Sequence, residues 1–268
     1  MVDPVAMVIG LLSGLLLGLT GAGGGVVAVP LLAVGLGLPL TAAAPLALLA
    51  VALTASAAAL AGLRRGLVRY RAAFVIAGVG LVCAPLGLQA AALAPERYLW
   101  WLFAAVMLLV AARMARSATQ DPVEFGALDI GDPLCPRDPH SGRFIWRRRV
   151  AGVMAAIGAA AGFLSGLLGV GGGFVIVPAL RAVSDLDMHA AIATSLMAIA
   201  LIALGTVGWA LAAGHEFQGL RAASYVTGAA GGTLAGRLTA RHLPTARLQQ
   251  LFAASMVGVA LLLLIRNN

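Results

Sequence analysis

Apolar residues in this chain occur in long blocks without a charged residue, separated by short stretches that carry most of the arginines. Most of the blocks are about as long as a helix that crosses the roughly 30 Å hydrocarbon core of a bilayer, which takes about 20 residues. This pattern predicts an all-α membrane protein whose main crossings follow the blocks. The blocks are residues 40–61, 72–93, 99–112, 190–213, 222–234 and 248–265.

The composition strengthens the membrane prediction. Of the 268 residues, 61% are hydrophobic and 10% are charged, whereas a soluble domain is about half apolar and roughly a quarter charged. All 18 basic residues are arginines and the net charge is +8. Because the arginines cluster between apolar blocks, the positive-inside rule accounts for them, and no nucleic-acid partner is predicted. Cys83 and Cys135 form no CxxC or ligand spacing, so no disulfide, metal site or cofactor is predicted.

The chain contains an internal repeat. Residues 14–25 read G-x-x-x-G-x-x-G-x-G-G-G, and residues 162–173 show the same spacing 148 positions later. Each stretch then reaches a proline, Pro30 or Pro178. A single inserted residue shifts the later landmarks, which continue to match: Gly87 with Gly236, Pro95 with Pro244, and Phe103 with Phe252. The ordered set of matches indicates a duplication.

The duplication divides the chain into three parts. We predict a first transmembrane repeat over residues 1–116, a linker over 117–149, and a second transmembrane repeat over 150–268. The linker holds the only long polar stretch and ends in the basic cluster 147–149. We interpret it as a solvated cytoplasmic linker that its arginines anchor at the next membrane segment.

Three adjacent glycines interrupt the first apolar segment of each repeat, residues 5–34 and 150–181. Each glycine weakens a helix by about 1 kcal/mol. If both segments cross the membrane as broken helices, the chain has eight crossings and two parallel repeats. If each segment instead turns back at the glycines as a re-entrant hairpin, three transmembrane helices remain in each repeat, and the two repeats are inverted.

The distribution of arginines distinguishes these topologies. With eight crossings, the arginine-poor face holds Arg97, Arg181, Arg237, Arg241 and Arg247. With two hairpins, it holds only Arg97, Arg221 and Arg266. The hairpin topology separates charge better, so we predict inverted repeats, a plan that recurs among secondary transporters. Both termini then lie outside and the linker lies in the cytoplasm.

The glycine triplets are the main candidate substrate-binding positions. They are Gly23, Gly24 and Gly25 in the first repeat, and Gly171, Gly172 and Gly173 in the second. Backbone that leaves a helix inside a bilayer is tolerated only where protein buries it or where it lines a wet cavity. Whether a half-helix begins directly after the glycines or at the proline, its free N–H groups and positive end favour an anion. The spacing of Gly14, Gly18, Gly162 and Gly166 indicates helix packing instead.

Hydroxyl side chains near the breaks are further candidates. Thr194 and Ser195 follow the second hairpin, and Thr20 and Ser165 lie beside the breaks. Most Ser and Thr in membrane helices only hydrogen-bond to their own helix. Acidic residues are nearly absent from the predicted spans, which argues against a cation substrate. No catalytic triad, HExxH motif or carboxylate pair is present, so we do not predict an enzyme.

The second repeat carries a resemblance to a known family. Residues 162–178 read Gly-Phe-Leu-Ser-Gly-Leu-Leu-Gly-Val-Gly-Gly-Gly-Phe-Val-Ile-Val-Pro, and residues 191–196 read Ala-Ile-Ala-Thr-Ser-Leu. Together they resemble the signature of the sulfite exporter TauE/SafE family of bacterial membrane permeases, and linker residues 138–146 are similar to its inter-repeat stretch. The first repeat has Leu46 and Ala47 at the positions of the Thr-Ser pair, so a family role for that pair applies only to Thr194 and Ser195.

The resemblance implies export of sulfite or an organosulfonate by a multi-pass protein of the bacterial inner (plasma) membrane. A membrane potential that is negative inside drives anions outward by about 2.3 kcal/mol per charge per 100 mV, so export could proceed without a coupling ion, and the sequence does not determine whether one is used. We expect alternating access, with a small anion and the lipid bilayer as partners and no prediction of oligomeric state. Two alternatives stay open: a transporter of another small anion such as a carboxylate, and a non-transporting membrane scaffold or assembly factor.

Overall fold

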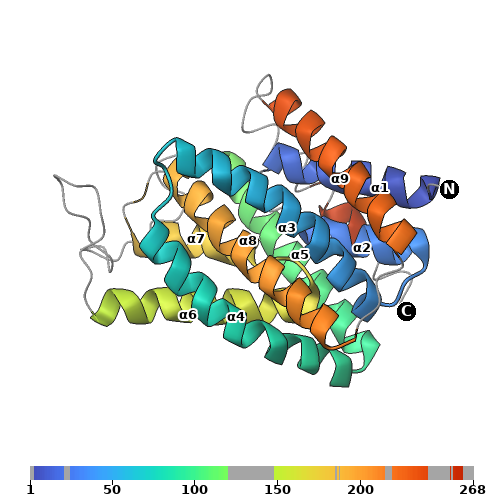
Figure 1. Ribbon diagram of the computed structural model, residues 1–268, viewed down its shortest axis with the longest axis horizontal. Helices are drawn as coiled ribbons and strands as arrows, with labels where there is room; N and C mark the ends of the chain where they lie inside the picture. Colours follow the sequence, from blue (N-terminus) through green and yellow to red (C-terminus); the bar gives the residue numbers. More distant parts are fainter. Residues whose placement is uncertain are drawn as a thin grey trace.

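The computed structural model is helical throughout its long segments (Figure 1). It describes residues 3–20, 25–119, 148–184, 186, 188–214, 219–240, 254 and 256–261. The predicted linker therefore lies largely outside the described residues, as does most of the apolar block 248–265. The helices are α1 (Pro4–Thr20), α2 (Gly25–Leu36), α3 (Leu40–Arg64), α4 (Tyr70–Leu93), α5 (Glu96–Thr119), α6 (Arg148–Leu168), α7 (Gly173–Val183), α8 (Met188–Ala212) and α9 (Gly219–Ala240).

Four of the described helices are long and apolar enough to cross a membrane, namely α3, α4, α6 and α8. Their apolar stretches contain 21 to 24 residues, or about 32–36 Å at 1.5 Å per residue, which exceeds the roughly 30 Å hydrocarbon core. The predicted blocks 99–112 and 222–234 lie within α5 and α9, which have 24 and 22 residues but also contain arginines. The prediction of a helical membrane protein is confirmed.

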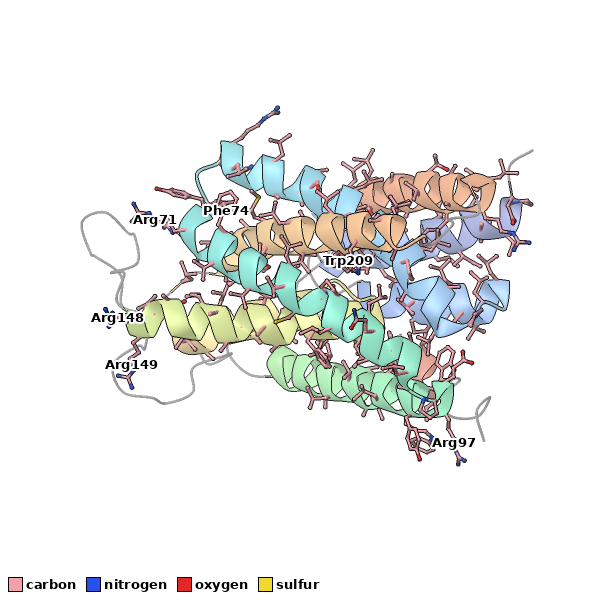
Figure 2. The ribbon with its side chains drawn as sticks, turned by 60° about the horizontal axis from the view of Figure 1, so that its bottom comes forward. Arg71, Phe74, Arg97, Arg148, Arg149 and Trp209 are labelled. Atoms are coloured by element: carbon pink, nitrogen blue, oxygen red, sulfur yellow. The ribbon has the colours of Figure 1, made fainter. Side chains whose placement is uncertain are left out.

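The short helices α2 and α7, of 12 and 11 residues, each follow a longer helix and reverse its direction. Helix α6 begins at the end of the molecule where Arg71, Arg148 and Arg149 lie, and α7 leads back to that end (Figures 1 and 2). Helix α1 begins at the opposite end, where Arg97 lies, and α2 leads back there. These two ends are called the Arg148 end and the Arg97 end below.

Helices from the two halves of the chain pack against each other. Helix α1 lies along α9, α6 along α4, and α3 along α8. Glycines let the backbones approach, because a Cβ at these positions would meet the main chain of the facing helix. The pairs are Gly14 with Ala229, Gly162 with Gly80, Gly166 with Ala84, and Gly236 with Gly18. The packing role predicted for Gly14, Gly18, Gly162 and Gly166 is therefore confirmed.

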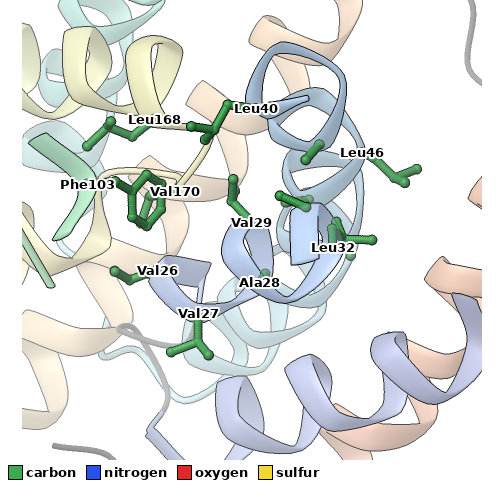
Figure 3. Packing of buried hydrophobic residues seen from close by; sticks show 14 of the residues in the cluster. Val26, Val27, Ala28, Val29, Leu32, Leu40, Leu46, Phe103, Leu168 and Val170 are labelled. Atoms are coloured by element: carbon green, nitrogen blue, oxygen red, sulfur yellow. The ribbon is translucent and has the colours of Figure 1, made fainter. Parts of the chain in front are cut away.

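Helix α2 lies inside one of two apolar cores. Its residues Val26, Val29 and Leu32 are fully buried. They belong to the same cluster as Phe103 of α5 and Val170 of the α6–α7 connection (Figure 3). The second core lies among α3, α4, α6, α7 and α8. Residues of the first half of the chain therefore hold the α6–α7 connection in place.

Candidate functional site

The connection between α6 and α7, residues 169–172, is a true break in the helix. Three of its residues are glycines in the left-handed region, with φ of +71° at Gly169, +77° at Gly171 and +70° at Gly172. Residues with a Cβ rarely adopt this conformation, so the glycines are what allow the chain to reverse here. The third glycine of the triplet, Gly173, is already the first residue of α7. The helix thus begins within the triplet, and Pro178 lies inside it rather than at its start.

The start of α7 presents backbone donors. Gly172 is its N-cap, and the N–H groups of Val175 and Ile176 both donate to the carbonyl of Gly172, at 3.1 and 3.2 Å. The N–H groups of Gly173 and Phe174 precede these first intrahelical bonds and have no acceptor within the helix. With the positive end of the helix dipole, they form a position that favours negative charge.

Three other helices enclose the break. A Cβ on Gly171 would lie 2.9 Å from Cγ1 of Val51 in α3 and 3.2 Å from Cγ2 of Ile199 in α8. A Cβ on Gly172 would lie 2.7 Å from the carbonyl oxygen of Ala161 in α6. The space around both residues is therefore sized for glycine, and a side chain here would displace α3, α6 or α8.

The first triplet is described only at its last residue. Gly25 is buried and begins α2, and a Cβ on it would lie 2.6 Å from the carbonyl oxygen of Val170 in the second break. Gly23 and Gly24 lie outside the described residues, and so does the side chain of Thr20. The structure thus brings Gly25 directly against the α6–α7 break.

Ser165 in α6 is fully buried, and its Oγ has no hydrogen-bond partner among the described residues. Other buried hydroxyls, such as those of Thr206 and Thr233, donate to the carbonyl four residues earlier in their own helix, at 2.7 Å each. Ser165 lies one turn after Ala161 on the same face of α6, and Ala161 contacts Gly172. The unpartnered hydroxyl therefore lies on the face of α6 toward the start of α7.

Thr194 and Ser195 are fully buried but do not lie at the break. The Thr194 hydroxyl accepts the backbone N–H of Arg69 at 3.0 Å, and Ser195 donates to the carbonyl of Ile192 at 2.8 Å. The residue of α8 that touches Gly171 is Ile199, five positions later, or about 7.5 Å along the helix axis. The pair lies on the side of this contact toward the Arg148 end.

A cavity of about 240 Å³ lies between the break and the Arg97 end. It meets the break through Ala44, whose Cα would lie 2.5 Å from a Cβ on Gly169, and through Gly166, the neighbour of Ser165. Among the described residues, only Gln89 and Trp209 bring polar side-chain groups to its lining, and none of the described lining residues is charged. The lining residues are Leu40, Ala44, Leu88, Gln89, Ala91, Ala92, Leu99, Gly166, Leu167, Trp209 and Ala213.

Carboxylates are absent from the surroundings of the break in the described part of the chain. The acidic residues there are Asp3, which pairs with Arg221 at 3.3 Å, and Glu96, which accepts the N–H of Leu40 at 3.3 Å. Both lie at helix ends on the Arg97 side. Within the described residues no group of three or more His, Cys, Asp or Glu could hold a metal ion.

Sequence reasoning missed three residues that the structure places at the break, beside Thr194 or in the cavity lining. Gly169 repeats Gly21 in the glycine motif, which was the signal that it belongs to the break. Arg69 was counted only as one arginine of a basic cluster, although its backbone meets Thr194. Gln89 is an amide within an apolar block, a combination that could have marked it as a cavity residue.

Comparison with known proteins decides the family. The sulfite exporter TauE/SafE family matches residues 6–263. The chain belongs to this family. A Xylella fastidiosa (strain Temecula1) protein named "Probable membrane transporter protein" is 32% identical over 269 residues, which cover 96% of this chain and 92% of the relative. Its namesake in strain 9a5c is 31% identical with the same coverage. No solved structure gives a significant match.

Membership in the TauE/SafE family makes this protein a multi-pass membrane transporter and not an enzyme. The resemblance seen in residues 162–178 and 191–196 is confirmed. The scaffold alternative is dropped, because the family is one of exporters and both relatives are named probable membrane transporter proteins.

Proposed function

We propose that this TauE/SafE protein exports sulfite or an organosulfonate and holds the anion at the α6–α7 break. The observation that carries the proposal is the buried, unpartnered hydroxyl of Ser165 beside the start of α7. Leaving a buried donor without an acceptor costs about 1–3 kcal/mol, which an oxyanion bound here would recover. The N–H groups of Gly173 and Phe174 add donors to the same place.

The proposed binding residues centre on the second repeat. Ser165 and the triplet Gly171–Gly173 form the core of the site, and Gly25 extends it because it abuts Val170. Gly23, Gly24 and Thr20 are included from their positions in the repeat. We assign Thr194 and Ser195 to the path leading to the site, because about 7.5 Å of α8 separates Thr194 from the break contact at Ile199.

The chemistry of the site suits a sulfur oxyanion. A sulfite or sulfonate group has three oxygens around sulfur, which can accept from donors that approach from different helices. A carboxylate offers two oxygens in one plane and can meet fewer of these donors at once. The described carboxylates, Asp3 and Glu96, lie at helix ends, so little negative charge opposes an anion at the break.

We also propose the inverted topology with the three predicted parts of the chain. The α1–α2 pair begins and ends at the Arg97 end, and the α6–α7 pair begins and ends at the Arg148 end, as expected for inverted re-entrant hairpins. Arg71, Arg148 and Arg149 share one end, which supports a cytoplasmic location for that end and for linker 117–149. The membrane is then the bacterial inner membrane.

The way the helices pair supports the proposal of alternating access. Helix α1 of the first repeat packs against α9 of the second, and α6 of the second packs against α4 of the first. Helices α3 and α8 also pack against each other, so each repeat contacts the other through several helices. The cavity toward the Arg97 end would then be the external half of the path in this conformation. Movement of one repeat against the other would close it and open the cytoplasmic half.

The test is anion flux in proteoliposomes, with the wild type, Ser165→Ala and Ser56→Ala. Ser56 undergoes the same chemical change, but its hydroxyl already bonds to the carbonyl of Ala52 at 2.6 Å. We expect sulfite or methanesulfonate flux from the wild type and from Ser56→Ala, and a drop of about tenfold or more in Ser165→Ala, as for the loss of one hydrogen bond to a charged group. If acetate is the only anion transported, the proposed substrate changes from a sulfur anion to a carboxylate. Equal flux of both variants would contradict a binding role for Ser165.

A further inference from the structure

A second orphaned donor lies at the Arg148 end, in the loop between α3 and α4. The Nε atom of Arg69 is buried and has no hydrogen-bond partner among the described residues. The side chain as a whole is only half-buried. A buried guanidinium N–H without an acceptor is costly, which indicates that an acceptor is supplied from outside the described chain.

The backbone of Arg69 is fixed against α8. Its N–H donates to the hydroxyl of Thr194 at 3.0 Å, and Thr194 is fully buried. The end of α3 packs in the same place, since a Cβ on Gly62 would lie 3.1 Å from Cβ of Ala193 and 3.2 Å from Cγ2 of Val68 in the following loop. A hydroxyl that accepts one bond keeps its own proton to donate. Arg69 and Thr194, called the corner below, therefore combine a cationic donor with a buried hydroxyl.

Among the residues that the structure describes, no carboxylate lies near this charge. The sequence contains no Asp or Glu between Asp3 and Glu96, while Arg64, Arg65, Arg69 and Arg71 fall within eight residues. Both of those acidic residues lie at the other end of the molecule. The described part of the corner is thus positive and held by packing, which is the arrangement that recognises an oxyanion.

The corner has no equivalent in the other repeat. By the repeat alignment, Arg69 corresponds to Phe217 and Thr194 to Leu46, so two apolar residues stand where the second copy of this pair would be. In an inverted arrangement those residues belong to the opposite side of the membrane. The recognition pair is therefore on one side only, as a transporter that captures its substrate on one side requires.

We infer that Arg69 and Thr194 form an anion-capture site at the cytoplasmic mouth, separate from the α6–α7 break, where a small oxyanion such as sulfite or a sulfonate is bound before it moves to the break. Arg69 Nε–H and the Thr194 hydroxyl donate to its oxygens. Thr194 lies about 7.5 Å along α8 from Ile199, so the anion has a short step to Gly171. This inference rests on the proposed function, because it assumes that the anion is cargo.

The experiment compares Arg69→Gln with Arg65→Gln in proteoliposomes loaded with sulfite, measuring KM and kcat for efflux from the cytoplasmic side. Arg65 is exposed in the same loop, so its substitution removes the same charge without touching the corner. We expect Arg69→Gln to raise KM by about 10- to 100-fold, as for the loss of a charge-assisted hydrogen bond, with a small change in kcat. Thr194→Val should raise KM in the same direction, and Thr194→Ser, which keeps the hydroxyl, should restore it.

The outcomes separate the two proposals. Equal KM values for the two arginine variants, with active wild type, overturn the capture site and leave the proposed function standing. A wild type without sulfite or sulfonate flux overturns both. Assays in zwitterionic and in phosphatidylglycerol-containing vesicles distinguish a free anion from a lipid phosphate. If the flux of Arg69→Gln depends on anionic lipid while its KM for sulfite is unchanged, the capture site is also overturned.

Discussion

The α6–α7 break and its counterpart between α1 and α2 share the glycine spacing but differ in their polar side chains. In the second repeat, Ser165 and Thr194 carry hydroxyls on or near the break, and the cation beside Thr194, Arg69, comes from the first repeat. The positions that correspond to these three residues in the other repeat are apolar. The corresponding residues are Ser165 and Leu17, Thr194 and Leu46, and Arg69 and Phe217, the last pair with the arginine in the first half of the chain.

The α1–α9 side also contains polar groups, and the described hydroxyls of Ser13 and Tyr225 there form hydrogen bonds within the protein. Ser13 donates to the carbonyl of Gly10 at 3.0 Å and lies 3.2 Å from the hydroxyl of Tyr225 in α9. The matching positions between α6 and α4 are Ala161 and Ala77. Under the proposed function, hydroxyls on the α1–α9 side stabilise helix packing, whereas the hydroxyl of Ser165 on the α6 side binds the anion. The two repeats share their glycine spacing, and a few polar positions distinguish the proposed site on the α6 side from its counterpart on the α1 side.

The largest effect expected is from a substitution that closes the second break. Gly172→Ala places a Cβ 2.7 Å from the carbonyl oxygen of Ala161 and forces a left-handed φ of +70° on alanine, which by itself costs about 1–2 kcal/mol. We expect transport to be lost and the unfolding midpoint in detergent to fall. The same change at Gly24 should keep part of the flux, because no unpartnered hydroxyl corresponds to Ser165 there.

Gly152→Ala is the matched control, because a Cβ on this α6 residue would meet nothing within 4 Å. It should leave both flux and the unfolding midpoint near the wild-type values. Equal losses in Gly172→Ala and Gly24→Ala would break the comparison, since the two triplets would then serve one shared site equally.

A smaller effect is expected from filling the cavity between the second break and the Arg97 end. Ala92 lines this cavity, so Ala92→Trp should obstruct it and reduce maximal flux several-fold without lowering the unfolding midpoint. The control is Val82→Trp on the same helix, because Val82 is 71% exposed and faces away from the packed interior. Unaltered maximal flux in Ala92→Trp would mean that the anion does not pass through this cavity.

Much of the fold could be predicted, because a segment that crosses a bilayer must be apolar, long enough to span it and hydrogen-bonded within itself. The blocks 40–61, 72–93 and 190–213 contain no charge, and a bilayer leaves such blocks few alternatives to a helix. The breaks were also predictable, since consecutive glycines at membrane depth disrupt a helix. Which helices pair was not, because small residues such as Gly14 and Gly162 show that a face packs closely without showing its partner.

The candidate site was predictable in kind but not in detail. The glycines 171–173 marked the break and Ser165 was a candidate because it lies beside it, yet the sequence alone could not separate Ser165 from serines that bond to their own helix. Its distinction depends on what surrounds its Oγ in the folded chain. Arg69 was hidden for a different reason: in a cluster of arginines beside a membrane segment, the positive-inside rule explains every member equally well. Only the contact with Thr194 and the buried Nε separate it from Arg65.

The smallest expected effect tests whether the polar pair on the α1–α9 side is structural. Tyr225→Phe removes one hydroxyl but leaves Ser13 bonded to Gly10, so we expect a loss of about 0.6 kcal/mol, the average for a hydrogen bond between membrane helices. Ser13→Ala instead leaves the Tyr225 hydroxyl buried without this partner, which should cost more, about 1–3 kcal/mol. Equilibrium unfolding in mixed micelles measures both, and sulfite flux should be unchanged in either variant at temperatures well below unfolding. A selective loss of flux in Tyr225→Phe, at unchanged stability, would assign this pair to the anion path and make the two sides functionally alike.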